Sequence, residues 1–102
     1  MLETSKLSLS PGAIIGILGG GQLGRMSALA AARLGFRCHI FTPENNSPAS
    51  HVAFKTTIAS YEDQDALRSF ANESDVITYE FENIPIETAL FLEQLKPVYP
   101  SP

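Results

Sequence analysis

The chain has 102 residues, a formal net charge of −4 and a hydrophobic content of 44%, which fits one globular domain. Its seven scattered basic residues argue against nucleic acid as a partner, because binding phosphates needs clustered Lys and Arg. The single cysteine excludes an internal disulfide and favours a reducing cytoplasm. No apolar run is long enough to cross a bilayer, so we expect no membrane partner.

Residues 1–12 are mostly polar, and we expect a flexible tail there, before a domain that spans residues 13–102. The apolar, β-branched run at 13–18 predicts a strand buried on both faces. After a glycine loop, residues 22–34 have a helical pattern, and Gly35 is typical of a helix end. The apolar positions of this helix are Leu23, Met26, Leu29, Ala30 and Leu34.

Further along the chain, residues 36–42, 56–59 and 75–79 are predicted as strands, and 97–102 as a last extended piece. Helices are predicted at 63–72 and 85–96, the first with an apolar stripe of Leu67, Phe70 and Ala71. Ser60 and Asp63 resemble a capping box for that helix. Strands thus alternate with helices, which predicts an α/β fold with a parallel sheet, helices on both faces and right-handed crossovers.

The loop GGGQLG, at residues 19–24, matches the pattern GxGxxG between a strand and a helix. In this pattern Gly19 permits a tight turn, Gly21 lets an anionic group approach the backbone, and Gly24 allows close helix packing. The helix N-terminus then favours a phosphate or a carboxylate. A tight turn without a ligand is the alternative interpretation, and no Gly-Lys-Ser/Thr follows to make a Walker A loop.

A dinucleotide-binding fold places an acidic residue at the end of its second strand, where it binds the ribose. Thr42 occupies that position here, and Glu44 lies two residues beyond it. An NAD-binding domain of an oxidoreductase therefore stays open, as does a non-catalytic binding module.

The segment TYEFENIP, at residues 78–85, places Glu80 and Glu82 after a strand, on the same sheet edge as the glycine loop. Two carboxylates there suit amines or sugar hydroxyls. Alternatively, these acids complement the dipole of the next helix, with Asn83 as its N-cap. No Cys/His cluster has the spacing of a zinc site.

Several motifs together resemble one family. They are GILGGGQLGRM, SPASHVA, SYEDQDALRSFA, DVITYEFENIP and PVYPSP. They are similar to the N-terminal domain of N5-carboxyaminoimidazole ribonucleotide synthetases, which belong to the ATP-grasp superfamily. The resemblance implies a Rossmann-like pre-ATP-grasp domain, with the ATP-grasp and C-terminal domains beyond this chain, in a homodimeric enzyme. Thr42-Pro43-Glu44 departs from the family, in which Asp-Pro often stands.

The resemblance also implies a reaction. ATP phosphorylates bicarbonate, and the exocyclic amine of 5-aminoimidazole ribonucleotide then takes up the carboxyl group, directly or through CO₂. ATP and Mg²⁺ would be held by the ATP-grasp domain, so we expect neither catalytic residues nor metal ligands in this chain, and no turnover by it alone.

By the same resemblance, Gln22 and Leu23 touch the ribonucleotide, and Glu80 faces its ribose or base. Glycines at the loop allow its close approach. The expected substrate-binding residues are Gly20, Gly21, Gln22, Leu23, Tyr79 and Glu80.

Overall fold

The computed structural model describes residues 9–80 and 84–102. In this part, four parallel strands form one sheet in the order β3-β2-β1-β4. The strands are β1 (Ile14–Leu18), β2 (Arg37–Thr42), β3 (Lys55–Ile58) and β4 (Val76–Tyr79). The helices are α2 (Gln22–Arg33), α3 (Gln64–Glu73), α4 (Ile86–Glu93) and a short 3₁₀ helix, η1 (Ala49–His51).

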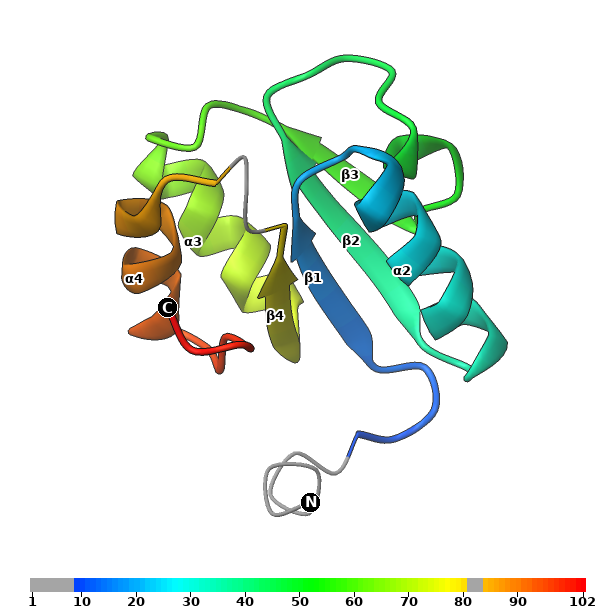
Figure 1. Ribbon diagram of the computed structural model, residues 1–102. Coiled ribbons are helices and arrows are strands. Elements are labelled where there is room, and N and C mark those ends of the chain that lie inside the picture. Colours follow the sequence, from blue (N-terminus) through cyan, green and yellow to red (C-terminus); the bar gives the residue numbers. More distant parts are fainter. Residues whose placement is uncertain (1–8, 81–83) are drawn as a thin grey trace.

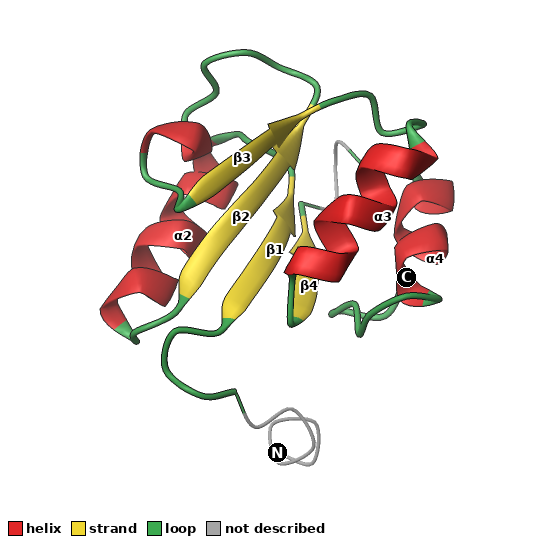
Figure 2. Cartoon of the chain, turned by 180° about the vertical axis from the view of Figure 1, so that it is seen from behind, coloured by secondary structure: helices red, strands yellow, loops and turns green. Residues whose placement is uncertain are grey.

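The helices form two layers around the sheet. Helix α2 covers one face, whereas α3 and α4 lie on the other (Figure 1). Seen from behind, all four strand arrows point toward the same end of the sheet (Figure 2). This arrangement confirms the α/β fold with a parallel sheet and helices on both faces.

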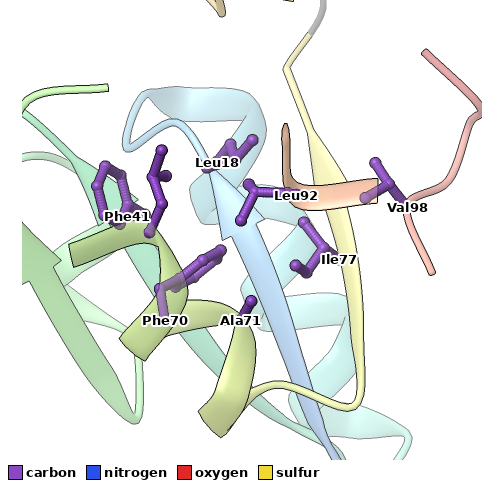
Figure 3. Packing of buried hydrophobic residues seen from close by; sticks show 8 residues of the cluster. Leu18, Phe41, Phe70, Ala71, Ile77, Leu92 and Val98 are labelled. Atoms are coloured by element: carbon purple, nitrogen blue, oxygen red, sulfur yellow. The ribbon is translucent and has the colours of Figure 1, made fainter. Parts of the chain in front are cut away.

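A hydrophobic core fills the space between the sheet and helices α3 and α4. Leu18 and Ile77 point into it from neighbouring strands, and Phe70 and Leu92 meet them from the two helices (Figure 3). Each of these four side chains is no more than 1% exposed. The stripe predicted for α3 is confirmed, because Leu67, Phe70 and Ala71 are all buried. The sheet is therefore fixed to a rigid layer on this side.

Helix α2 packs on the opposite face through small residues. Its buried positions are Gly24, Ala28 and Ala31, whereas Leu23 and Met26 are each 63% exposed. A Cβ added at Gly24 would lie 2.8 Å from the Gly19 carbonyl oxygen, so the start of α2 approaches β1 more closely than a larger residue allows. The large apolar residues correctly indicate a helix, but they do not form its buried face. All five predicted apolar positions are exposed: Leu23, Met26, Leu29, Ala30 and Leu34.

Two sequence predictions need correction. The C-terminal piece is not a regular strand: Val98 forms only an isolated parallel bridge with Ile77, since the flanking prolines have no N–H to continue a ladder. Asp63, not Ser60, is the N-cap of α3, and its Oδ1 accepts a 3.0 Å hydrogen bond from the Ala66 N–H. The Ser60 hydroxyl instead accepts from the nearby Glu62 N–H.

The beginning of the described chain contacts the end of α2. The Gly12 N–H donates to the Gly35 carbonyl at 2.7 Å, and Gly35 has a φ of 88°, as expected of a glycine that ends a helix. Most of the predicted tail, residues 1–8, lies outside the described residues. Among the described helices, none is both long enough and apolar enough to span a membrane.

Candidate functional site

The carboxyl ends of the strands bring four separate segments to one edge of the sheet. The glycine loop follows β1, Thr42 ends β2, Tyr61 comes after β3, and Glu80 follows β4. They surround a pocket of about 320 Å³. Its lining residues are Gly19, Gly20, Gly21, Thr42, Pro43, Glu44, Tyr61 and Glu80. The predicted meeting of the glycine loop with the acidic segment is therefore confirmed.

Glu80 binds the N-terminus of α2. Its Oε1 accepts a 2.7 Å hydrogen bond from the Gly24 N–H, 56 residues away in the chain. Helix α2 has no acidic residue in its own first turn, and its N-cap, Gly21, offers no side-chain hydrogen bond. Glu80 thus supplies from β4 the negative charge that a helix N-terminus favours.

Glu80 complements the dipole of a different helix from the one that its position in the sequence suggests. In the described residues, Glu80 complements α2 and not α4, the helix that follows it in the chain. Helix α4 begins after Pro85, which makes no side-chain cap, and its predicted acid Glu82 and N-cap Asn83 lie outside the described residues.

A second pocket, of about 220 Å³, shares Glu80 with the first. Leu23, Gly24, Tyr79 and Glu80 are among its lining residues. Of the predicted site residues, Gly20 and Gly21 thus line the first pocket, Leu23 and Tyr79 line the second, and Glu80 lines both. Gln22 is exposed and lines neither.

Gly20 also makes room for a side chain of this protein. A Cβ at this position would lie 2.5 Å from Ser47 Oγ and 3.1 Å from the Thr42 Cβ. Ser47 is only 2% exposed, and within the described residues its hydroxyl has no hydrogen-bond partner. The loop is further tied to this region by the Gly20 carbonyl, which accepts from the Ala49 N–H at 2.9 Å.

Tyr61 is a pocket residue that our functional analysis of the sequence missed. Its ring stacks on Phe41, with 5.9 Å between the ring centroids. Burial raises the pKa of the Tyr61 phenol to about 12, and the Glu80 carboxylate adds to this rise, whereas a side-chain hydrogen bond with Thr42 opposes it. Its position just after a strand was the signal that would have found it, because such residues meet at one sheet edge.

The first pocket has an acidic character. Glu44 and Glu80 are both in its lining, and no Lys or Arg is among the described lining residues. Arg25, in the first turns of α2, directs Nη1 to the Pro48 carbonyl at 3.5 Å. Cys38 is buried in the hydrophobic cluster beneath α2. In residues 9–80 and 84–102, no group of three His, Cys, Asp or Glu side chains is placed to hold a metal ion.

Comparison with known families gives a match over nearly the whole chain. The family described as the ribonucleotide synthetase pre-ATP-grasp domain matches residues 13–102. A bifunctional purine synthesis protein of Dictyostelium discoideum is 55% identical over 98 residues, which are 96% of this chain and 10% of that protein.

Two further relatives carry more specific descriptions. The N5-carboxyaminoimidazole ribonucleotide synthase of Brucella melitensis is 52% identical over 97 residues, covering 95% of this chain and 27% of the relative. The crystal structure of N5-carboxyaminoimidazole synthase from Aspergillus clavatus, in complex with ADP and 5-aminoimidazole ribonucleotide, superposes with a TM-score of 0.76 at 30% identity, over 89% of this chain and 24% of that chain. This chain spans about a quarter or less of the length of these relatives.

Proposed function

This chain belongs to the family of ribonucleotide synthetase pre-ATP-grasp domains, and from that membership we propose that it forms the substrate-binding domain of an N5-carboxyaminoimidazole ribonucleotide synthetase. The whole enzyme would carboxylate 5-aminoimidazole ribonucleotide with ATP and bicarbonate in purine biosynthesis, releasing ADP and phosphate. The resemblance found in the sequence supports the same assignment, and the Aspergillus relative was crystallised with that ribonucleotide.

The observation that carries the proposal is the position of Glu80 between two pockets at the carboxyl edge of the sheet. A carboxylate accepts hydrogen bonds and donates none, so it suits the hydroxyls of a ribose and the amine of an aminoimidazole. Glycine backbone and the Tyr61 ring line the first pocket with that carboxylate, and such a lining suits a flat ligand.

The described residues that line the two pockets do not fit the triphosphate of ATP. The carboxylates of Glu44 and Glu80 repel a triphosphate, and no lysine or arginine is among the described residues that line either pocket at this edge. We therefore propose that the nucleotide, its metal ion and bicarbonate bind to parts of the enzyme other than these 102 residues. We also propose that the enzyme works as a cytoplasmic homodimer, as in the family that the sequence resembles.

An NAD-binding domain is the second candidate, because Glu44 lies at the same pocket as the glycine loop. An NMR titration of the ¹⁵N-labelled chain separates the two. We expect 5-aminoimidazole ribonucleotide to shift the amides of Gly20, Gly21, Leu23 and Glu80, and NAD to shift none of them. Shifts with NAD alone would overturn the proposal.

A chimera tests the function in a complete enzyme. This chain would replace the matching 97 residues of the Brucella melitensis relative, and ATP hydrolysis that depends on the ribonucleotide would be measured. We expect the chimera to be active and its Glu80→Gln variant to show a raised KM for the ribonucleotide or a lowered kcat. The unmodified Brucella enzyme is the control. A folded chimera that hydrolyses ATP without responding to the ribonucleotide would contradict the assignment.

A further inference from the structure

We propose that Glu80 is an internal anion that occupies the glycine loop and closes it to phosphate groups, so that the loop selects ligands by their hydrogen-bond donors. A GxGxxG loop at a helix N-terminus normally offers its backbone N–H groups to a phosphate. In this chain the side chain of Glu80, which follows β4, already takes that place.

Three glycines of the loop give the Glu80 carboxyl group its space. A Cβ at Gly19 would lie 2.7 Å from Glu80 Oε2, and one at Gly24 would lie 3.1 Å from Oε1. A Cβ at Gly21 would lie 3.6 Å from both oxygens. The first, third and sixth positions of the motif thus surround a carboxylate of the protein itself. The absence of side chains at Gly19 and Gly24 is thus explained without a bound phosphate, whereas a Cβ at Gly21 would only touch the carboxylate.

The negative charge of Glu80 opposes phosphate binding in addition to the space that its carboxyl group fills. The Gly24 N–H, which would otherwise point at an incoming anion, already donates to Glu80 at 2.7 Å. A phosphate would have to displace this carboxylate, and in the first pocket it would also meet the carboxylate of Glu44. The nearest arginine in sequence, Arg25, donates to the Pro48 carbonyl and lines neither pocket. The carboxylates therefore repel a phosphate.

Groups that donate hydrogen bonds are attracted by the Glu80 carboxylate that repels a phosphate. The Gly24 N–H donates to Oε1 of Glu80, and the Glu80 carboxylate borders both pockets. Vicinal hydroxyls or an amine would add to its hydrogen bonds without displacing it. The identity of such a ligand as a ribonucleotide rests on the proposed function, whereas the exclusion of phosphate does not.

The experiment compares pyrophosphate binding by three versions of this chain. The Gly24 amide is followed by ¹⁵N NMR in the native chain, in Glu80→Gln and in Glu80→Ala while pyrophosphate is added. We expect no shift in the native chain. In Glu80→Ala the cavity is empty, so the Gly24 amide shifts on binding. In Glu80→Gln the side chain remains but its charge is lost, so binding is detectable and weaker than in Glu80→Ala.

Glu44→Ala is the matched control, because it removes a carboxylate from the same pocket but leaves the Gly24 contact intact. It should not bind pyrophosphate at Gly24, and equal binding by this variant and Glu80→Ala would show that general negative charge is the cause. A shift of Gly24 in the native chain would overturn the proposal, as would silence of both folded Glu80 variants. If Glu80→Ala does not fold, the proposal is decided by comparing the pyrophosphate shift of the Gly24 amide in Glu80→Gln with that in the native chain.

These outcomes are independent of the ribonucleotide titration. A native chain that ignores 5-aminoimidazole ribonucleotide but gains pyrophosphate binding on loss of Glu80 would contradict the proposed function and keep this inference. The reverse combination would keep the function and remove the inference.

Discussion

The imidazole of His39 and the hydroxyl of Thr57 are joined by a 2.7 Å hydrogen bond between Nε2 and Oγ1, which links β2 to β3. The histidine is 1% exposed and meets the Phe70 ring at a centroid distance of 4.9 Å. Its Nδ1 lies 3.8 Å from a Glu73 carboxylate oxygen, and Glu73 is paired with Lys55. His39 is therefore a titratable group inside the packing of the fold and outside the candidate site.

Stability should fall as the pH falls through the range of a histidine. Burial lowers the pKa of His39 below its ordinary 6.5, and the Glu73 carboxylate only partly opposes this. Below pH 6.5 the unfolded chain therefore binds a proton that the folded chain does not, and the folded state loses stability by up to about 1.4 kcal/mol per pH unit. The Lys55 hydrogen bond lowers the pKa of Glu73, so its contribution is lost only in more acidic solution.

Urea unfolding at about pH 7.5 and about pH 5.5 measures this effect. We expect the native chain to lose more stability between these conditions than His39→Gln, which keeps a hydrogen-bonding side chain but does not titrate. His51→Gln is the control, because it removes an exposed histidine and should keep the native pH dependence. Equal pH dependence of the native chain and His39→Gln would show that His39 is not the source.

Tyr61 should remain a neutral hydrogen-bond donor throughout the physiological pH range. Its pKa is raised to about 12 by burial and by the Glu80 carboxylate. In an alkaline titration followed by ultraviolet absorbance, we expect Tyr61→Phe to remove an ionisation step near pH 12. The substituted ring keeps its stacking on Phe41, so the fold should persist. Loss of a step near pH 10 instead would mean that the phenol is exposed.

Gly16→Ala should destabilise the protein by about 1–3 kcal/mol, the usual cost of overpacking. A Cβ at Gly16 would lie 2.5 Å from Ser74 Oγ and 2.7 Å from Phe70 Cζ. The Phe70 ring cannot easily move aside, because it is held in edge-on contact by Phe41 and by His39.

A double-mutant cycle with Phe70→Leu checks this cause. If the ring is the obstacle, Gly16→Ala should cost less in the Phe70→Leu background than in the native one. Thermal or urea unfolding gives the four stabilities. Costs that simply add would place the strain elsewhere, and a fully stable Gly16→Ala would contradict the packing described.

The order of elements was predictable because each depends on local pattern. The strand at residues 14–18 is a continuous apolar run, and Gly35 ends α2 as its position indicates. The face of α2 was not predictable in this way. Periodicity marks its large residues, but close packing on the sheet selects Gly24 and Ala28 instead, and that closeness is a property of the assembled fold.

The candidate site shows the same division. The sheet-edge rule correctly brings the glycine loop and Glu80 together, since both follow parallel strands. It does not say which helix Glu80 complements, because a contact between residues 56 positions apart depends on the order of strands in the sheet. Nor does the sequence show that Gly20 makes room for Ser47.

Gly21→Val should abolish ribonucleotide binding without unfolding the chain. The backbone at Gly21 is extended, with φ of −78° and ψ of −163°, which valine adopts readily. A Cβ there would lie 3.6 Å from the Glu80 oxygens, so alanine fits, whereas the two methyl groups of valine would extend toward the carboxylate and the ligand. Gly21→Ala is therefore the matched control.

Both variants would be titrated with 5-aminoimidazole ribonucleotide, as the chain alone and within the Brucella chimera. We expect Gly21→Ala to keep most of the affinity and Gly21→Val to lose it, with similar unfolding midpoints for the two variants. Full ribonucleotide affinity in Gly21→Val would show that the ligand does not approach this backbone. In that case the pocket at β4, lined by Leu23 and Tyr79, would be the place to look for the ligand, since Glu80 is reached from that side as well.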